Sequence, residues 1–332
     1  MTAHGPAAAA GWAIDHVVGE PPTALHPVAW FGTAMTRLES HTYRDASAAG
    51  AIHLAIGVGG AWLLGRLATR LLGAPIATAL ATSVSVAGRM LLDEGTAIID
   101  AVERGDLDDA RRRLPTLVGR DPSLLYEDEV LRAVVESVAE NSVDAVIAPL
   151  LWATAGGAPA VLAHRASNTL DAMVGHPNQR YQRFGRAAAR FDDALNWLPA
   201  RLAAAGVAVL VPSRRRAIWQ CVRHDARAHP SPNAGVIEAA VAAAVGVRVG
   251  GMNRYGDHIE DRGILGSGDP PSVAEARRAV ALVRRLGGLA ALAALVTAWP
   301  STTSWNAGPT PWTVIEDPPR GRCGRGLRRR GR

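Results

Sequence analysis

The chain has 332 residues, is 48% hydrophobic and carries a formal net charge of +6, and this length suits one large domain or two ordinary ones. All 36 basic residues are arginines, which excludes a P-loop lysine and a lysine Schiff base. Seven of these arginines lie in residues 301–332, so the rest of the chain is nearly neutral and we expect no nucleic-acid partner. The two cysteines, Cys221 and Cys323, lack metal-site spacing and predict no disulfide framework.

Apolar stretches alternate with strongly charged ones, a pattern typical of a membrane protein with large polar loops. Residues 6–18 form a short apolar run, and the prolines of residues 15–32 predict a loop. Residues 50–88 are apolar apart from interruptions that include Gly73 and Pro75. Because about 20 apolar residues cross a bilayer as a helix, this stretch predicts two spans, or one span and an interfacial helix.

Residues 89–144 are polar and helical in pattern. Asp106 is a plausible N-cap for a helix over Leu107–Val118. In the helix that follows, apolar residues recur at positions i, i+3, i+4 and i+7, namely Leu131, Val134, Val135 and Val138. That face is expected to be buried.

Residues 145–163 are apolar but contain two prolines and two adjacent glycines. They predict two half-helices with a turn at Gly156–Pro159, which would return the polar segments 136–144 and 164–171 to the same side.

Residues 198–212 and 286–299 are further candidate spans, and residues 213–285 form a long polar region between them. Residues 301–332 form an Arg/Gly/Pro-rich tail that is expected to be disordered. The sequence therefore predicts an all-α, polytopic membrane protein with broken or re-entrant helices and large polar helical loops.

The segment R-A-V-V-E-S-V-A-E-N-S-V-D, residues 132–144, places Glu136, Glu140 and Asp144 in one stripe on a helix, four positions apart. Carboxylates in line repel one another unless a cation lies among them, and Mg²⁺ carrying a nucleotide phosphate would supply it. A solvated polar face is the alternative interpretation.

Two further segments carry similar chemistry. In H-R-A-S-N-T-L-D, residues 164–171, Arg165, Asn168 and Asp171 are helical neighbours; they suit phosphate and metal binding, or a capping cluster at a helix end. In residues 183–201, the arginines suit membrane-interface anchors, whereas Asp192 and Asn196 at i, i+4 are harder to explain in that way.

A turn at S-P-N, residues 231–233, could start a helix at Ala234, where free backbone N–H groups would bind an anion. An ordinary capped turn is the alternative. His224 and His229 are weak evidence for a metal site.

Taken together, these strings resemble the adenosylcobinamide-phosphate synthase family of cobalamin biosynthesis, the CbiB/CobD type. The resemblance covers roughly residues 11–300 and rests on the number, order and spacing of modest motifs. The matching strings include G-E-P-P at 19–22, H-P-V at 26–28, V-G-R-D at 118–121, E-S-V-A-E-N-S-V-D at 136–144, N-T-L-D-A-M-V-G at 168–175, F-D-D at 191–193, N-W-L-P-A-R at 196–201 and S-P-N-A-G at 231–235.

The resemblance implies a single integral-membrane synthase domain over residues 1–300. It also implies an amide ligation in which the free propionate of adenosylcobyric acid joins aminopropanol or its phosphate, with ATP as the expected driver and Mg²⁺ as the metal. The residues expected to take part in catalysis are Glu136, Glu140, Asn141, Asp144, Asn168 and Asp171. Those expected to bind substrate or phosphate are Arg120, Arg165, Arg190, Arg201, Ser231, Asn233 and His26. Those expected to hold the metal are Glu140, Asp144, Asp171 and Asp192.

Two other functions fit parts of the sequence. A corrinoid transporter or membrane scaffold would explain the broken helix without ligase chemistry. An intramembrane Mg²⁺-dependent prenyltransferase would use acidic motifs, although the usual pair of D-x-x-x-D motifs is not seen. Loop arginines predict a multi-pass protein of the cell membrane with its site facing the cytoplasm, where other enzymes of the cobalamin pathway would be partners.

Overall fold

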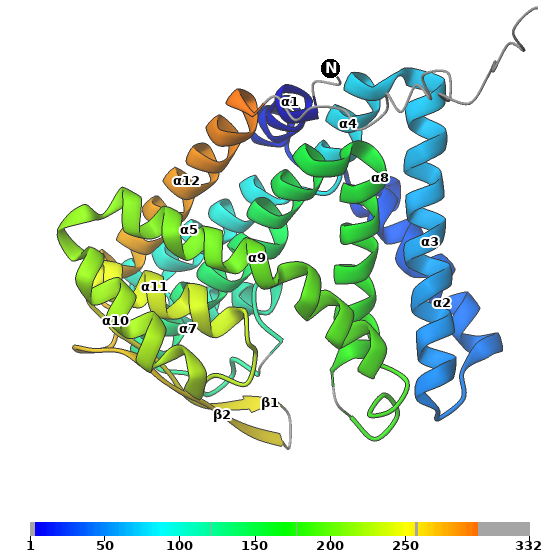
Figure 1. Cartoon of the computed structure of the whole chain (residues 1–332). Coiled ribbons are helices and arrows are strands. Elements are labelled where there is room, and N and C mark those ends of the chain that lie inside the picture. The colour runs from blue at the N-terminus through cyan, green and yellow to red at the C-terminus, as the bar shows by residue number, and fades with distance from the viewer. Residues whose placement is uncertain (1–3, 120, 177, 256–257, 298–332) are drawn as a thin grey trace, which may run out of the picture. The chain divides into compact units, whose positions relative to one another are not determined.

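The computed structural model describes residues 4–119, 121–176, 178–255 and 258–297, which belong to one compact unit (Figure 1). The α-helices among them are α1 (His4–Val18), α2 (Pro27–Thr42), α3 (Ser47–Leu72), α4 (Ala74–Ser83), α5 (Gly88–Glu103), α6 (Leu107–Arg113), α7 (Glu127–Ser142), α8 (Ala148–Leu170), α9 (Arg186–Leu210), α10 (Arg215–His224), α11 (Ala234–Val245) and α12 (Val273–Val296). Strands β1 (Arg248–Tyr255) and β2 (His258–Gly266) pair in an antiparallel hairpin. The prediction of an all-α fold is confirmed, with this hairpin as an addition. The predicted disordered tail lies outside the described residues.

Among the described residues, four helical stretches are long and apolar enough to cross a membrane, and they run over Ser47–Leu72, Ala74–Glu103, Glu127–Gly175 and Val273–Val296. A fifth is present if α9 and the helical segment Pro212–Ala228, which meet at 106°, form one bent span. The predicted polytopic membrane protein is confirmed at this level. The predicted span at 198–212 overlaps the second half of α9, which begins at Arg186 and ends at Leu210. The described part of the predicted span at 286–299 overlaps the end of α12, which begins earlier, at Val273.

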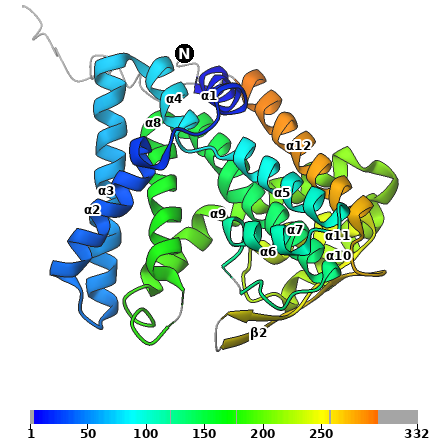
Figure 2. The same ribbon diagram turned by 180° about the vertical axis from the view of Figure 1, so that it is seen from behind.

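The long apolar stretch at residues 50–88 is divided at Gly73. This glycine has φ +79°, a left-handed conformation that breaks the helix, and Pro75 lies in the first turn of α4. Figure 2 shows α3 as a long helix at one side of the molecule, next to α2. The stretch is therefore one long helix followed by a short one.

Helix α8 is also broken, at Gly157, whose φ of 65° and ψ of −155° are not helical. The predicted break at Gly156–Pro159 is thus confirmed. The chain turns back there, and the second half of α8 packs beside α3 (Figure 1). Close approach is possible because Gly65 of α3 faces the backbone of Pro159, where a Cβ would come within 2.5 Å.

The loop predicted over residues 15–32 is too long. Helix α1 continues to Val18 and α2 begins at Pro27, so the connection is short, and it contains one 3-10 turn at Thr23–Leu25. His26 caps α2, since its Nδ1 accepts a hydrogen bond from the backbone N–H of Val28 at 3.2 Å. A proline at the first helical position starts a helix as readily as it ends one, which explains the error.

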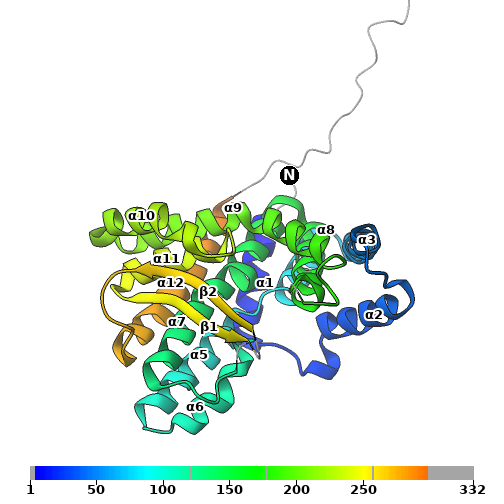
Figure 3. The ribbon, with the colours of Figure 1, turned by 90° about the horizontal axis from the view of Figure 1, so that it is seen from below.

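The core lies around α7 and α11. The predicted apolar face of α7 is buried, and every residue of α11 is buried as well. Both helices contact the hairpin, which Figure 3 shows across their lower ends. The predicted polar region at 213–285 therefore contains a fully buried helix and a sheet. Asp106 caps α6 as predicted, through its Oδ1 and the N–H of Asp109 at 2.9 Å, but α6 ends at Arg113.

Candidate active site

A small polar pocket lies where α7, α9, the start of α11 and the two ends of α8 meet. It encloses about 80 Å³. Its lining residues are Glu140, Val143, Asp144, Asp171, Asp192, Asp193, Asn196, Ser231, Asn233, Ala234 and Ile237. Five of them are carboxylates, and no Arg or His side chain is among the described residues that line it.

The break in α8 brings two of these carboxylates together. Asp144 precedes α8 and Asp171 follows it, 27 positions later in the chain, yet both line the same pocket. Each lies in a short π-helical segment, Val143–Ile147 or Asp171–Gly175. Such segments often occur at functional sites because the wider turn redirects side chains.

Asp192 is held by a chain of buried polar side chains. Asn196 Nδ2 donates a hydrogen bond to Asp192 Oδ2 at 2.8 Å, and Asn196 Oδ1 lies 2.9 Å from His164 Nε2. All three residues are buried. Since an amide oxygen only accepts, His164 carries its proton on Nε2. The other carboxylate oxygen of Asp192, Oδ1, is buried without a hydrogen-bond partner in the part of the chain that the structure describes.

Arg165 lies behind the pocket. Its guanidinium interacts electrostatically with Asp144, Asp192 and Glu20. Its Nη1 donates to Asn168 Oδ1 at 3.5 Å, and Asn168 in turn lies against Asp144. Arg165 therefore places a positive charge beside these carboxylates, although it does not line the pocket itself.

The predicted turn at residues 231–233 is present and α11 begins at Ala234. Ser231 Oγ accepts from the N–H groups of Asn233 and Ala234 at 3.3 and 3.2 Å, which is an ordinary cap. Arg201 fixes this turn, because its Nη1 donates to Asn233 Oδ1 at 2.7 Å and its Nη2 to the carbonyl of Pro232 at 3.0 Å. Arg201 was predicted to bind phosphate, but these bonds already use its guanidinium.

A second ionic cluster lies at the edge of the pocket. Arg262 of β2 pairs with Glu140 at 3.4 Å and with the buried Glu238 of α11 at 3.9 Å. His229 Nε2 lies 3.5 Å from the same Glu238 carboxylate. Burial, together with the charge of Arg262, lowers the pKa of His229. The hairpin thus supplies a cation to the acidic stripe of α7.

The remaining predicted residues lie away from the pocket. Glu136 accepts from the N–H of Gly250 at 2.8 Å and faces the hairpin. Asn141 donates to the carbonyl of Ser137 at 2.9 Å, and Arg190 is exposed on α9. His26 caps α2, as described above. Arg120 lies outside the described residues. The stripe over residues 132–144 is thus divided, with its first half at the hairpin and its second at the pocket.

The metal prediction has a limited structural basis. Within the described ranges, no group of three or more His, Cys, Asp or Glu side chains is arranged to hold a metal ion. A Mg²⁺ ion is commonly held by one or two carboxylates and completes its shell with water and substrate phosphate. The pocket suits an ion of that kind rather than a site built by protein ligands alone.

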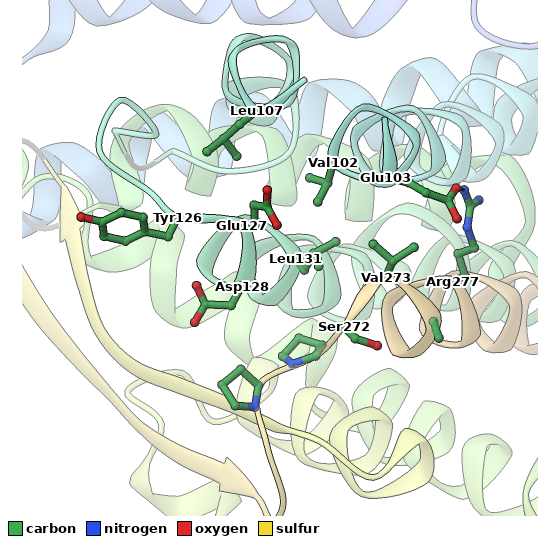
Figure 4. A pocket seen from close by; sticks show the side chains of 13 residues that line it. Val102, Glu103, Leu107, Tyr126, Glu127, Asp128, Leu131, Ser272, Val273 and Arg277 are labelled. Carbon is green, nitrogen blue, oxygen red and sulfur yellow. Dashed lines mark hydrogen bonds and ion pairs between the residues drawn. The ribbon is translucent and has the colours of Figure 1, made fainter. Parts of the chain in front are cut away.

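A much larger cavity lies elsewhere and involves none of the predicted residues. It measures about 1210 Å³ and lies between α5, α7 and the segment entering α12 (Figure 4). Leu131 lines it, nine positions before Glu140, so on a helix of 3.6 residues per turn the two face opposite sides of α7. Its walls mix apolar side chains with Glu103, Glu127 and Arg277. It is therefore separate from the carboxylate pocket.

Three residues that were given no role in the predicted site belong to it. Asp193 and Asn196 line the pocket, and Arg262 pairs with Glu140 across 122 positions of sequence. The spacing of Asp192 and Asn196 had already indicated more than membrane anchoring. No local pattern pointed to Arg262, because its partners are distant in the chain.

Comparison with known proteins gives a consistent result. Residues 8–283 match the family described as CobD/Cbib protein. The cobalamin biosynthesis protein CobD of Mycobacterium tuberculosis is 48% identical over 293 residues, which cover 86% of this chain and 93% of that protein. The CobD proteins of Geobacter metallireducens and Chromobacterium violaceum are 42% and 40% identical, over 73% and 82% of this chain and 80% and 89% of their own lengths. No solved structure matches the chain. The chain therefore belongs to the CobD/CbiB family of cobalamin biosynthesis proteins.

Proposed function

We propose that this membrane protein forms the amide bond between the free propionate of adenosylcobyric acid and aminopropanol or its phosphate, with ATP as the co-substrate. The observation that carries the proposal is the carboxylate pocket. Its volume of about 80 Å³ is far too small for a corrinoid, since pockets for drug-sized ligands measure about 300–1,000 Å³. Its five carboxylates, with no arginine or histidine beside them among the lining residues that the structure describes, suit the ammonium group of a small amine.

The chemistry of amide formation requires such a pocket. A primary amine is protonated near neutral pH, and only its free form attacks a carbonyl carbon. Carboxylates hold the ammonium, and one of them accepts its proton as a general base. The nitrogen then bonds to the acyl carbon and the activating group leaves. Asp144, Asp171 and Asp192 are the candidates for this base.

The acid must be activated before the amine attacks, because a carboxylate is a poor electrophile. ATP would supply a phosphoryl group to the carboxylate oxygen, and phosphate would leave when the C–N bond forms. Mg²⁺ bound with the nucleotide would offset the charge of the phosphates. Glu140, Asp144, Asp171 and Asp192 are the residues that would hold it, one or two at a time.

The contacts of the predicted arginines indicate which of them is available to bind phosphate. Arg165 lies beside the carboxylates, and its Nε is buried without a hydrogen-bond partner among the described residues. Arg201 is committed to the turn before α11, and Arg190 is exposed away from the pocket. We therefore propose Arg165, rather than Arg190 or Arg201, as the residue that binds the phosphate or the acyl oxygen.

Loop arginines also support a location in the cell membrane with the site on the cytoplasmic side, where ATP is present. Protease accessibility of the loops around α6 and α10 in inverted and right-side-out vesicles tests this orientation. Cleavage only in right-side-out vesicles would reverse it.

A corrinoid transporter remains the second candidate, because the broken helix α8 resembles the discontinuous helices of transporters. The two functions differ in their products. Purified protein in detergent is incubated with adenosylcobyric acid, aminopropanol phosphate and Mg-ATP, and mass spectrometry follows the corrinoid. A gain equal to the amine minus water supports the ligase. An unchanged corrinoid in a sample that still binds it supports transport.

A further inference from the structure

A second pocket, largely apolar, lies behind the carboxylate pocket. It encloses about 260 Å³ between α2, α3 and the second half of α8. Phe31 and Met35 of α2, Ile56 and Leu64 of α3, and Leu162 of α8 form its walls. Gly60 of α3 leaves one side open, since a Cβ at that position would meet nothing within 4 Å. The space is suited to an apolar group of moderate size.

Three polar side chains line this apolar space. The hydroxyl of Thr169 donates to the carbonyl of Arg165 at 2.8 Å, which leaves Arg165 itself and Ser85, and Ser85 is completely buried. In the described part of the chain, neither Arg165 Nε nor Ser85 Oγ has a hydrogen-bond partner. Buried donors without partners are uncommon in folded proteins and each is unfavourable by about 1–3 kcal/mol. An acceptor on a bound ligand would satisfy both of them.

Arg165 also connects this pocket to the carboxylate pocket. It lines the apolar pocket, while its guanidinium interacts with Asp144 and Asp192 of the carboxylate pocket. The two pockets therefore meet at one side chain. One offers apolar walls with a cationic end, and the other offers anionic walls.

We propose that the apolar pocket receives the edge of the corrinoid that carries the reacting propionate, with the carboxyl oxygens directed at Arg165. This inference rests on the proposed function. The two reacting groups of an amide ligation, a carboxylate and an ammonium, have opposite charge. The apolar pocket ends at a cation and the other pocket is lined by carboxylates, so each suits one of these groups. A corrinoid exceeds this volume, so only its edge, with ring methyl groups beside the propionate, enters. The carboxyl then stands between the two pockets, next to the amine.

Neighbouring glycines of α3 provide a matched test. Gly59 and Gly60 both have open space where a Cβ would lie, but only Gly60 lines the pocket. Gly60→Phe fills the pocket, and Gly59→Phe adds the same side chain to the same helix elsewhere. Equilibrium binding of adenosylcobyric acid to each purified variant is measured without ATP or amine, so the readout does not depend on ligation.

We expect Gly60→Phe to weaken corrinoid binding at least about 10- to 200-fold, the range seen when a pocket cannot accommodate a single methylene, while Gly59→Phe binds as the wild type does. Ala61→Leu, which also narrows the pocket, is the second variant if Gly60→Phe does not fold. Unchanged binding in a folded pocket-filling variant would overturn the inference and favour a lipid chain as the occupant. Equal weakening in both glycine variants would also overturn it, because the effect would then come from α3 itself. A wild type that binds adenosylcobyric acid but forms no amide refutes only the proposed function.

Discussion

The break in α8 is the structural feature on which the site depends most, and Gly157→Ala tests it. Gly157 has φ 65° and ψ −155°, a region of backbone conformation that is essentially restricted to glycine. Placing alanine there costs about 1–3 kcal/mol of folding free energy from backbone strain.

Packing adds a second contribution at the same position. A Cβ on residue 157 would lie 2.7 Å from Cε1 of His4 and 3.0 Å from Oγ1 of Thr78. Forcing an extra methyl group into such a contact typically costs a further ~1–3 kcal/mol of folding free energy. The distortion would also move Asp144 relative to Asp171, because they lie at opposite ends of α8, so ligation should fall together with stability.

Thermal and denaturant unfolding in detergent measure this change, and Gly105→Ala is the control. Gly105 has φ +75°, but a Cβ there would meet nothing within 4 Å, so that variant carries only the backbone strain, about 1–2 kcal/mol. Gly157→Ala should therefore be clearly less stable than Gly105→Ala. Equal losses in the two variants would refute the packing argument, and a Gly157→Ala protein with normal stability and turnover would refute the role of the break.

Three further variants each remove one side chain whose contacts or burial the structure describes. Asn196→Ala should lower kcat about 10- to 100-fold with little change in the KM for corrinoid, because Asp192 loses its support, and Asn196→Gln should restore part of the rate. Arg262→Gln should raise the KM for ATP but not that for the amine, because the acidic pocket loses the positive charge beside Glu140 and then repels the nucleotide phosphates more strongly; steady-state kinetics measures both constants. Burial raises the pKa of Asp15 from its ordinary value of 3.8 to about 6, so the wild type loses stability as the pH rises from about 4 to about 6, where the carboxyl is already ionised in the unfolded chain but still protonated in the folded one. The thermal stability of Asp15→Asn relative to the wild type should therefore rise across that range and level off above it, and a flat difference would contradict this.

Much of the architecture could be predicted because it depends on local pattern. The apolar periodicity of α7, the glycine and prolines that break α8, and the S-P-N turn before α11 all act within one or two helical turns. The predicted break also returned the segments 136–144 and 164–171 to the same side of the molecule. That Asp144 and Asp171 then line one pocket is a result of tertiary packing.

Other parts depended on contacts between distant segments. Glu136 and Glu140 occupy one helical stripe, yet Glu136 accepts a hydrogen bond from the hairpin and does not line the pocket, whereas Glu140 pairs with Arg262 of the hairpin and also lines the pocket. The hairpin itself escaped prediction because its strands lack a clear apolar alternation and contain several glycines. Arg201 resembles a phosphate ligand in sequence, but the structure shows it bonded to Asn233. Spacing identifies which residues share a face, and only tertiary packing decides what that face meets.

The central claim is that the carboxylate pocket binds and deprotonates the amine. The most direct test is the ligation kinetics of Asp144→Asn, Asp171→Asn and Asp192→Asn, beside the control Asp93→Asn, which removes an exposed carboxylate from α5. We predict that kcat falls about 10²- to 10⁴-fold in the pocket variant that removes the general base, that the KM for the amine rises in the other pocket variants, and that both constants stay unchanged in the control. Full turnover with an unchanged KM for the amine in all three folded pocket variants would contradict the account.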